Sequence, residues 1–354
     1  MNAADVLAGL WAAAVGGDEY GAVDLLRTAL DAGIDEETLL LDVIAPVQLR
    51  VGAEWAAGRL TVAQEHAVTA INERAMAAIA HHEPHPPRAP AGSRGRVTVS
   101  CVDGEWHALP ARLVAETLRL RGWRVDFLGA RTPTSHLIAH LHRTDPDAVL
   151  LSVSIPVHLP AAHTAITACQ AIGVPVMAGG GAFGPGGRYA RALGADRWAA
   201  DAREAADALE AGLTRPSPAA IRQVVDDLPH LADQEYSMVT QARGQLVKQT
   251  LTGLEGRAPG VGGYSEEQRE RTAEDVAHIV DFLTTALYVD DRELFTGFLL
   301  WTADVLAARG VPGRSLSTCL DVLAEQLYDF PRALALLGQG TAALDARSVP
   351  GPRG

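Results

Sequence analysis

The spacing of apolar residues changes twice along the chain and divides it into three segments. In residues 1–82, apolar positions recur every three or four residues in four stretches, which predicts four helices joined by short turns, and hence an antiparallel bundle. Residues 96–213 alternate five short β-rich runs with helical stretches, which predicts a parallel five-stranded α/β sheet covered on both faces. Residues 217–345 return to helical spacing and predict an all-α domain of at least four helices.

Local signals mark where these segments and their helices begin and end. Proline-rich stretches at Glu83–Gly95 and Thr214–Ala219 cannot continue a helix, so residues 83–95 are predicted to be a linker. Within the bundle, Gly58 ends the third helix, and Thr61 followed by Gln64 has the form of a capping box. The fourth helix is therefore expected to start directly after Thr61.

The composition of the 354 residues excludes several classes of protein. A net charge of −13 and the absence of any basic run argue against nucleic-acid binding. Charged residues interrupt the longest apolar stretches, and the N-terminus lacks a positively charged signal region, so we expect a cytoplasmic protein without a membrane anchor. The three cysteines, Cys101, Cys169 and Cys319, are widely spaced, which predicts buried thiols and neither a disulfide framework nor a zinc site.

The segment Asp103–Pro110, directly after the first predicted strand, carries the clearest candidate chemistry. Loops that follow parallel strands meet at one edge of the sheet, where α/β proteins bind ligands, so His107 should lie at that edge. Glu105, two residues earlier, can accept the second ring N–H and make the imidazole a better metal ligand. On these residues alone, a surface histidine beside a helix-capping acid is an equal alternative.

The loops after the third and fourth strands add two serines and a run of three glycines. Together with the histidine loop, they resemble the cobalamin-binding domain of corrinoid proteins. In that family a D-x-H-x-x-G loop supplies the lower ligand of cobalt, an S-x-L loop lines the cavity for the displaced base, and a Gly-Gly loop packs along the nucleotide tail. The resemblance implies His107 as the cobalt ligand, and Asp103, Glu105, Trp106, Ser152, Ser154, Gly179, Gly180 and Gly181 as cofactor-binding residues. Glu105, Pro110 and Pro156 stand where the family has Asp, Gly and Leu.

A second match lies in the bundle, where Trp55 is followed after nine residues by Glu65 and His66. This pattern is similar to that of light-sensing cobalamin-dependent transcriptional repressors, and it implies an upper pocket for the adenosyl group of adenosylcobalamin. An indole can fill the space beside the sugar, while a carboxylate and an imidazole can pair with ribose hydroxyls. Without that context, Trp55 would be a core aromatic, and Glu65 and His66 would cap a helix. Ala56 stands where those repressors have a second histidine, and the chain starts at the bundle, so direct DNA binding is not expected.

The order of the three segments resembles that of the photocobilins, cobalamin photoreceptors that also hold a bilin. This resemblance implies a globin-like fold for residues 217–345, with biliverdin as a second chromophore. Arg271, Glu274, His278 and Asp281 share one helix face and could bind propionate and pyrrole groups, although a solvated charged face is the alternative.

The function that follows is that of a light sensor rather than an enzyme, in which photolysis at the upper ligand changes the packing of the domains. This function does not determine whether the protein assembles as a homo-oligomer. One alternative is a corrinoid methyl carrier of a methyltransferase system, which needs the first two segments only. Another is a flavodoxin-like protein for a different cofactor, which requires the Glu105 and His107 match to be accidental.

Overall fold

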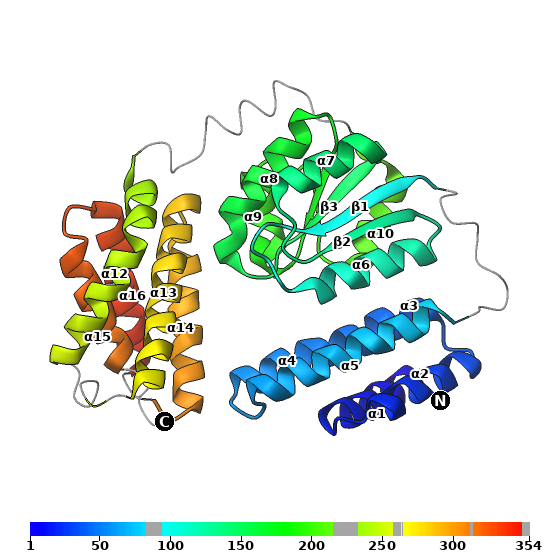
Figure 1. The fold of residues 1–354 in the computed structure, drawn as a ribbon, viewed down its shortest axis with the longest axis horizontal. Coiled ribbons are helices and arrows are strands. Elements are labelled where there is room, and N and C mark those ends of the chain that lie inside the picture. The colour runs from blue at the N-terminus through cyan, green and yellow to red at the C-terminus, as the bar shows by residue number, and fades with distance from the viewer. Residues whose placement is uncertain (83–93, 215–232, 258–262, 264, 312–313, 349–354) are drawn as a thin grey trace, which may run out of the picture. The chain divides into compact units, whose positions relative to one another are not determined.

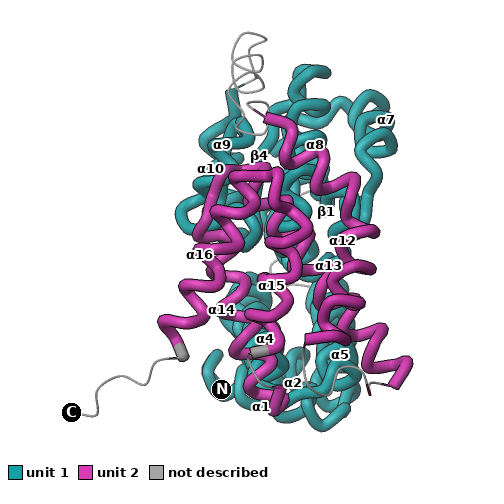
Figure 2. The backbone as a smooth tube through the Cα atoms, turned by 90° about the vertical axis from the view of Figure 1, so that its left-hand side faces the viewer, with its two compact units in different colours: residues 1–225 teal, residues 226–354 magenta. Residues whose placement is uncertain are grey.

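The structure, a computed structural model, describes residues 1–82, 94–214, 233–257, 263, 265–311 and 314–348. The chain forms two compact units, residues 1–225 and 226–354, which Figure 2 shows in separate colours. The first unit contains both the predicted bundle and the predicted α/β domain. In the second unit, the described residues form helices joined by short turns.

The N-terminal bundle is built as its apolar pattern predicts. Its helices are α1 (Ala3–Val15), α2 (Glu19–Asp31), α3 (Glu36–Thr38), the π-helix η1 (Leu39–Ile44), α4 (Ala45–Ala56) and α5 (Val62–Ala80). The elements α3, η1 and α4 follow one another without a break, so the predicted third helix is a single path with a π-helical stretch inside it. The capping box at the start of α5 is confirmed, because the backbone N–H of Gln64 donates to Thr61 Oγ1 at 3.2 Å and the Thr61 N–H donates to Gln64 Oε1 at 2.9 Å.

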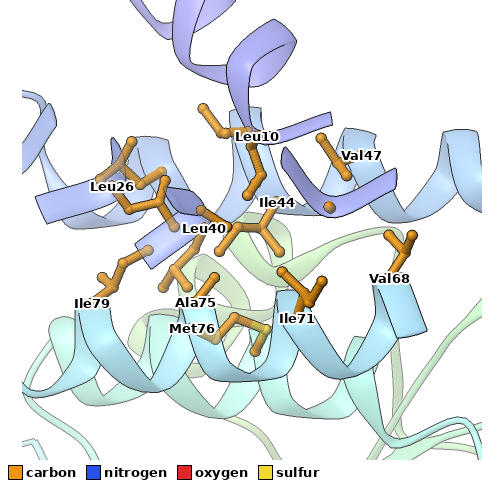
Figure 3. Close-up of a cluster of buried hydrophobic side chains, with 14 of the residues drawn as sticks. Leu10, Leu26, Leu40, Ile44, Val47, Val68, Ile71, Ala75, Met76 and Ile79 are labelled. Carbon is orange, nitrogen blue, oxygen red and sulfur yellow. The ribbon is translucent and has the colours of Figure 1, made fainter. Parts of the chain in front are cut away.

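The core of this bundle is aliphatic. Figure 3 shows side chains of α5 facing those of the other helices, and the labelled residues are Leu10, Leu26, Leu40, Ile44, Val47, Val68, Ile71, Ala75, Met76 and Ile79. Each large side chain buried in this way contributes about 1.5–3 kcal/mol relative to an exposed position. Leu109 and Leu113, from the first helix of the α/β domain, belong to the same core, which joins the bundle to that domain.

The α/β domain is a five-stranded parallel sheet with the order β2-β1-β3-β4-β5. Its strands are β1 (Arg96–Cys101), β2 (Arg124–Gly129), β3 (Ala148–Ser152), β4 (Val176–Gly179) and β5 (Arg197–Ala199). Its helices are α6 (Ala108–Leu120), α7 (Thr134–Thr144), α8 (Leu159–Ala171), α9 (Arg188–Ala192) and α10 (Ala202–Ala211), with the short 3₁₀ turns η2 (Pro156–His158), η3 (Gly181–Phe183) and η4 (Pro185–Gly187). Helices α6 and α10 pack together on one face, and α7 and α8 pack together on the other (Figure 1). The predicted parallel five-stranded α/β class is confirmed, and this strand order is the one found in flavodoxin-like folds.

This strand order determines where a ligand site can form. The chain leaves β1 toward β2 on one side and later returns to place β3 on the other side of β1. The loops after β1 and β3 therefore diverge at a topological switch point, where open α/β sheets bind ligands. Residues 102–107 and 153–155 occupy these two loops.

The second unit consists of five helices in its described residues. They are α12 (Glu235–Arg257), α13 (Glu266–Val289), α14 (Arg292–Ala308), α15 (Arg314–Gln326) and α16 (Pro331–Ser348). Its all-α class is confirmed, whereas the globin-like arrangement stays a prediction. The first residues of the predicted segment, 217–232, lie outside the described residues. None of the helices in the described ranges could span a membrane.

Candidate functional site

A buried carboxylate connects the two loops at the switch point. Glu105 has no exposed surface, and its Oε1 accepts the backbone N–H of His107 at 2.9 Å and lies 2.5 Å from His107 Nδ1. Its Oε2 accepts the backbone N–H groups of Ser154, at 2.7 Å, and Ile155, at 3.1 Å, in the loop after β3. One side chain thus holds the histidine and fixes the neighbouring loop.

These contacts determine the charge of Glu105 and the tautomer of His107. Burial raises the pKa of the Glu105 carboxyl, but hydrogen bonds from His107, Ser154 and Ile155 outweigh this effect and lower the pKa to about 2. A carboxylate can only accept, so the hydrogen of the shared contact belongs to Nδ1 of His107. In the neutral ring, Nε2 then carries the lone pair that a metal requires.

The exposed indole of Trp106 brings the loop next to the bundle. Its ring lies 4.2 Å from that of His107, measured between centroids, with the planes 33° apart. It also meets the ring of His66 on α5 edge-on at 6.2 Å. The structure therefore places the predicted lower residue His107 and the predicted upper residue His66 next to the same indole.

Glu65 and His66 are bonded to each other, since a Glu65 carboxylate oxygen pairs with Nδ1 of His66. The second carboxylate oxygen accepts the hydroxyl of Thr69 at 3.0 Å. Thr61 makes the side-chain cap of α5, and Glu65 lies in the first turn of that helix, where an acidic residue favours the helix dipole, so the capping alternative stays open beside the binding role. Trp55 is half-buried and packs against the bundle core, which agrees with the alternative that it is a core aromatic.

A cavity of about 580 Å³ opens between the sheet, α6, α10 and the bundle. Its predicted lining residues are Ser152, Ser154, Gly179, Gly180 and Gly181. Short side chains make the space, notably Ala111, Ala178, Ala199, Ala200, Ala202 and Ala205. The lining residues that sequence reasoning missed include Leu41, Ala45 and Gln48 from the bundle and Arg203 from α10. The spacing of the bundle residues by three and four along one helix face was their only signal in the sequence.

Gly180 allows the loops after β3 and β4 to approach closely. Its φ is +105°, and a Cβ at this position would lie 2.2 Å from the carbonyl oxygen of Val153. Only glycine fits both the dihedral angle and the contact. Asp103, by contrast, is exposed in the turn after β1.

The four residues predicted for a second chromophore, Arg271, Glu274, His278 and Asp281, lie on α13. Arg271 pairs with Glu267 one turn away, and both side chains are largely exposed. Asp281 accepts two hydrogen bonds from Arg243 of α12. These ion pairs agree with the alternative of a solvated charged face, and the bilin site stays a prediction.

Comparison with known proteins defines the class of the first unit. Residues 95–210 match the family described as the B12 binding domain, and residues 6–80 match a second family with the same description. These segments are B12 binding domains, they support a cobalamin cofactor, and they confirm the resemblance inferred from the loops and the bundle.

Among curated proteins, the chain is similar to two HTH-type transcriptional repressors of Myxococcus xanthus. It is 34% identical to CarH over 111 residues, which are 31% of this chain and 35% of the repressor. It is 31% identical to CarA over 94 residues, which are 27% of this chain and 31% of that repressor. The chain thus spans about a third of the length of either. Among solved structures, the monomethylamine corrinoid protein of Methanosarcina barkeri matches with a TM-score of 0.50 and 20% identity, over 59% of this chain and 100% of that chain, which shows the shared fold.

Proposed function

We propose that the chain is a cobalamin-dependent light sensor in which His107 ligates cobalt from below. The observation that carries this proposal is the Glu105–His107 pair at the switch point, with Nδ1 of the ring engaged and Nε2 available. The residues fit the cofactor in a second respect, because the lining of the adjacent cavity includes two serines and three glycines beside alanines and larger aliphatic side chains, and the cavity can take a nucleotide tail. When bound, adenosylcobalamin supplies a cobalt–carbon bond that visible light breaks.

The bundle residues bind and shield the upper ligand. Glu65 and His66 offer a carboxylate and an imidazole to the ribose hydroxyls of an adenosyl group, and Trp55 excludes water beside it. A methyl group has no hydroxyls to pair with. This arrangement favours the sensor over the methyl carrier, which is the alternative for a chain with the fold of a corrinoid protein.

Contacts between the bundle and the α/β domain could transmit a change at this site. Arg203 lines the cavity and makes hydrogen bonds of 3.0 and 2.7 Å to Asp42 of the bundle. Arg121 of the loop after α6 binds Glu37 through two hydrogen bonds of 3.0 and 2.9 Å. Occupancy of the cavity can therefore bias how the bundle packs on the sheet, which is the two-state element that a sensor needs.

The second chromophore is a separate part of the proposal. The order of the domains supports biliverdin binding in residues 217–345, which would extend sensitivity toward red light. A red-absorbing band should appear when the full-length protein is produced together with a haem oxygenase. A spectrum that is flat above the cobalamin bands would remove biliverdin from the proposal and leave the cobalamin part standing.

The deciding experiment is an absorption spectrum of the full chain with adenosylcobalamin, recorded in darkness and after illumination. We expect a histidine-ligated spectrum that changes irreversibly with light, and a change of the elution volume in gel filtration. His107→Ala should weaken binding and abolish the histidine-ligated bands, whereas the control His136→Ala, at an exposed position of α7, should change neither. A spectrum of His107→Ala identical to that of the wild type would overturn the ligand assignment.

A further inference from the structure

A chain of polar side chains crosses from the apolar bundle core to the upper site. Asn72 Nδ2 donates to Gln48 Oε1 at 2.8 Å, and Gln48 Nε2 donates to Thr69 Oγ1 at 2.8 Å. Thr69 in turn donates to Glu65 Oε1 at 3.0 Å, and Glu65 pairs with His66. Four hydrogen bonds thus connect a core residue of α5 with the imidazole beside Trp106.

Stability alone does not account for this chain. Asn72 is completely buried, and its Oδ1 has no hydrogen-bond partner among the described residues. Leaving such a group unpaired costs about 1–3 kcal/mol, and an aliphatic residue among Val68, Ile71 and Met76 would avoid the cost. A buried polar group that lowers stability needs another reason for its presence.

The direction of each of the four hydrogen bonds between Asn72 and His66 is determined. An amide nitrogen can only donate, so Thr69 accepts from Gln48 and must direct its own hydrogen to Glu65. One oxygen of Glu65 is then held by Thr69, and the other holds Nδ1 of His66. The neutral imidazole of His66 is thereby fixed in the tautomer whose Nε2 accepts a hydrogen bond.

This row of hydrogen-bonded side chains also reaches the cavity between the sheet and the bundle. Gln48 lines that cavity, and it lies on the same side of α4 as Trp55, seven residues or about two turns further on. Glu65, Thr69 and Asn72 follow one another at spacings of four and three on the facing side of α5. Gln48 of α4 therefore hydrogen-bonds two residues of α5.

We propose that Gln48, Thr69 and Asn72 are positioning residues that hold Glu65 and His66 in the arrangement that selects an adenosyl upper ligand. This inference rests on the proposed function. It assigns the selectivity to hydrogen-bond direction: Glu65 remains an acceptor for one ribose hydroxyl, and His66 Nε2 for another. Without the Thr69 hydroxyl, the carboxylate can rotate and the tautomer of His66 is no longer determined.

The test compares adenosylcobalamin with methylcobalamin in spectroscopic titrations of the full chain in darkness. Thr69→Val keeps the size of the side chain and removes the hydroxyl, so it should lower the affinity for adenosylcobalamin about 10-fold, as loss of a supporting hydrogen bond does at metal sites. The affinity for methylcobalamin should stay within about 2-fold. Thr69→Ser should restore the preference. Thr28→Val serves as the control, because it removes a hydroxyl that donates to the backbone carbonyl of Asp24 at 2.8 Å.

The outcomes separate this inference from the proposed function. If the wild type binds both cofactors and Thr69→Val keeps the wild-type ratio of affinities, or loses both affinities equally, the positioning role is overturned and cobalamin binding stands. If the wild type binds neither cofactor, the proposed function fails, and the inference with it. Asn72→Leu provides an independent readout, since it should raise the melting temperature while lowering the same ratio.

Discussion

The indole of Trp106 lies against the imidazole of His107, with ring centroids 4.2 Å apart and planes inclined by 33°. Trp106 is 55% exposed although it is one of the largest apolar side chains in the chain. It also makes an edge-type contact with the ring of His66, with the ring centroids 6.2 Å apart. Such aromatic contacts contribute about 0.5–1.5 kcal/mol each and hold the indole next to both histidines.

An exposed indole in contact with the proposed ligand ring should influence how fast cobalamin binds. We expect Trp106→Ala to increase the rate at which the histidine-ligated spectrum appears by about 2- to 10-fold. This factor corresponds to the free energy of the lost ring contact. Stopped-flow absorption after mixing with adenosylcobalamin measures this rate. Trp11→Ala in the bundle is the control. A slower rate in Trp106→Ala would mean that the indole helps to receive the cofactor and does not block it.

Replacing Glu105 should disturb both the ligand and the loop. In Glu105→Gln, a single carbonyl oxygen must serve the four N–H groups that the carboxylate now accepts. We expect an affinity for cobalamin lowered on the order of 10-fold. The free energy of unfolding should fall by about 1–3 kcal/mol, measured in urea without cofactor. Glu19→Gln, which removes a surface pair with Arg74, is the matched control. Unchanged values in both measurements would contradict the role of Glu105 as the link between the loops.

The parts of this fold that the sequence predicts are those that depend on local pattern. The start of α5 follows from Thr61 and Gln64 three residues apart, because both partners of the capping box lie within one turn. The meeting of the loops that carry His107 and Ser154 follows from the parallel order of the strands, which brings their carboxyl ends to one edge.

Other features depend on pairs that are distant in the sequence. Arg203 and Asp42 are 161 positions apart, and nothing in either segment indicates the partner. The π-helical stretch Leu39–Ile44 replaces regular α-helix although its residues fit an ordinary apolar face. Asn72 was visible in principle, because an amide stands among apolar residues at helical spacing, but its partner Gln48 lies on another helix.

Glu37 is the acceptor for two arginines that join the bundle to the α/β domain. It binds Arg121 twice, and it accepts from Arg203 at 3.3 Å. Glu37→Gln should lower the free energy of unfolding by about 1–3 kcal/mol. The substitution removes the charged acceptor of two partly buried guanidinium groups, and with it the bidentate contact. Urea denaturation measures the difference. Asp24→Asn, at an exposed ion pair with Arg27, should cost less than about 0.5 kcal/mol. Equal effects of the two substitutions would show that Glu37 acts as an ordinary surface residue.

The buried cysteines should be inert in the folded protein. Burial raises the pKa of the Cys169 and Cys319 thiols to about 12 from an ordinary value of 9.0. At pH 8 the native protein should not react with a disulfide reagent such as dithionitrobenzoate, and the thiols should react once urea unfolds it. Since the folded pKa is raised, the thiols favour the native state fully below pH 9, and this contribution declines as the pH rises further. Rapid labelling of native protein by the reagent would contradict the burial of these thiols.

Gly180 should be the most sensitive glycine of the cavity. Its φ of +105° and ψ of 160° belong to a region that other residues enter at a cost of about 1–3 kcal/mol, and the contact of a Cβ with Val153 adds to this cost. Gly180→Ala should therefore destabilise the protein and weaken cobalamin binding, because the loops after β3 and β4 must separate at the cavity wall. Gly52→Ala is the control, since a Cβ at this position of α4 meets nothing within 4 Å, and alanine should stabilise the helix by about 0.5–1 kcal/mol. The melting temperatures of the two variants should thus shift in opposite directions from the wild type, and only Gly180→Ala should weaken cobalamin binding. A Gly180→Ala variant with unchanged stability would mean that the loop adopts another conformation.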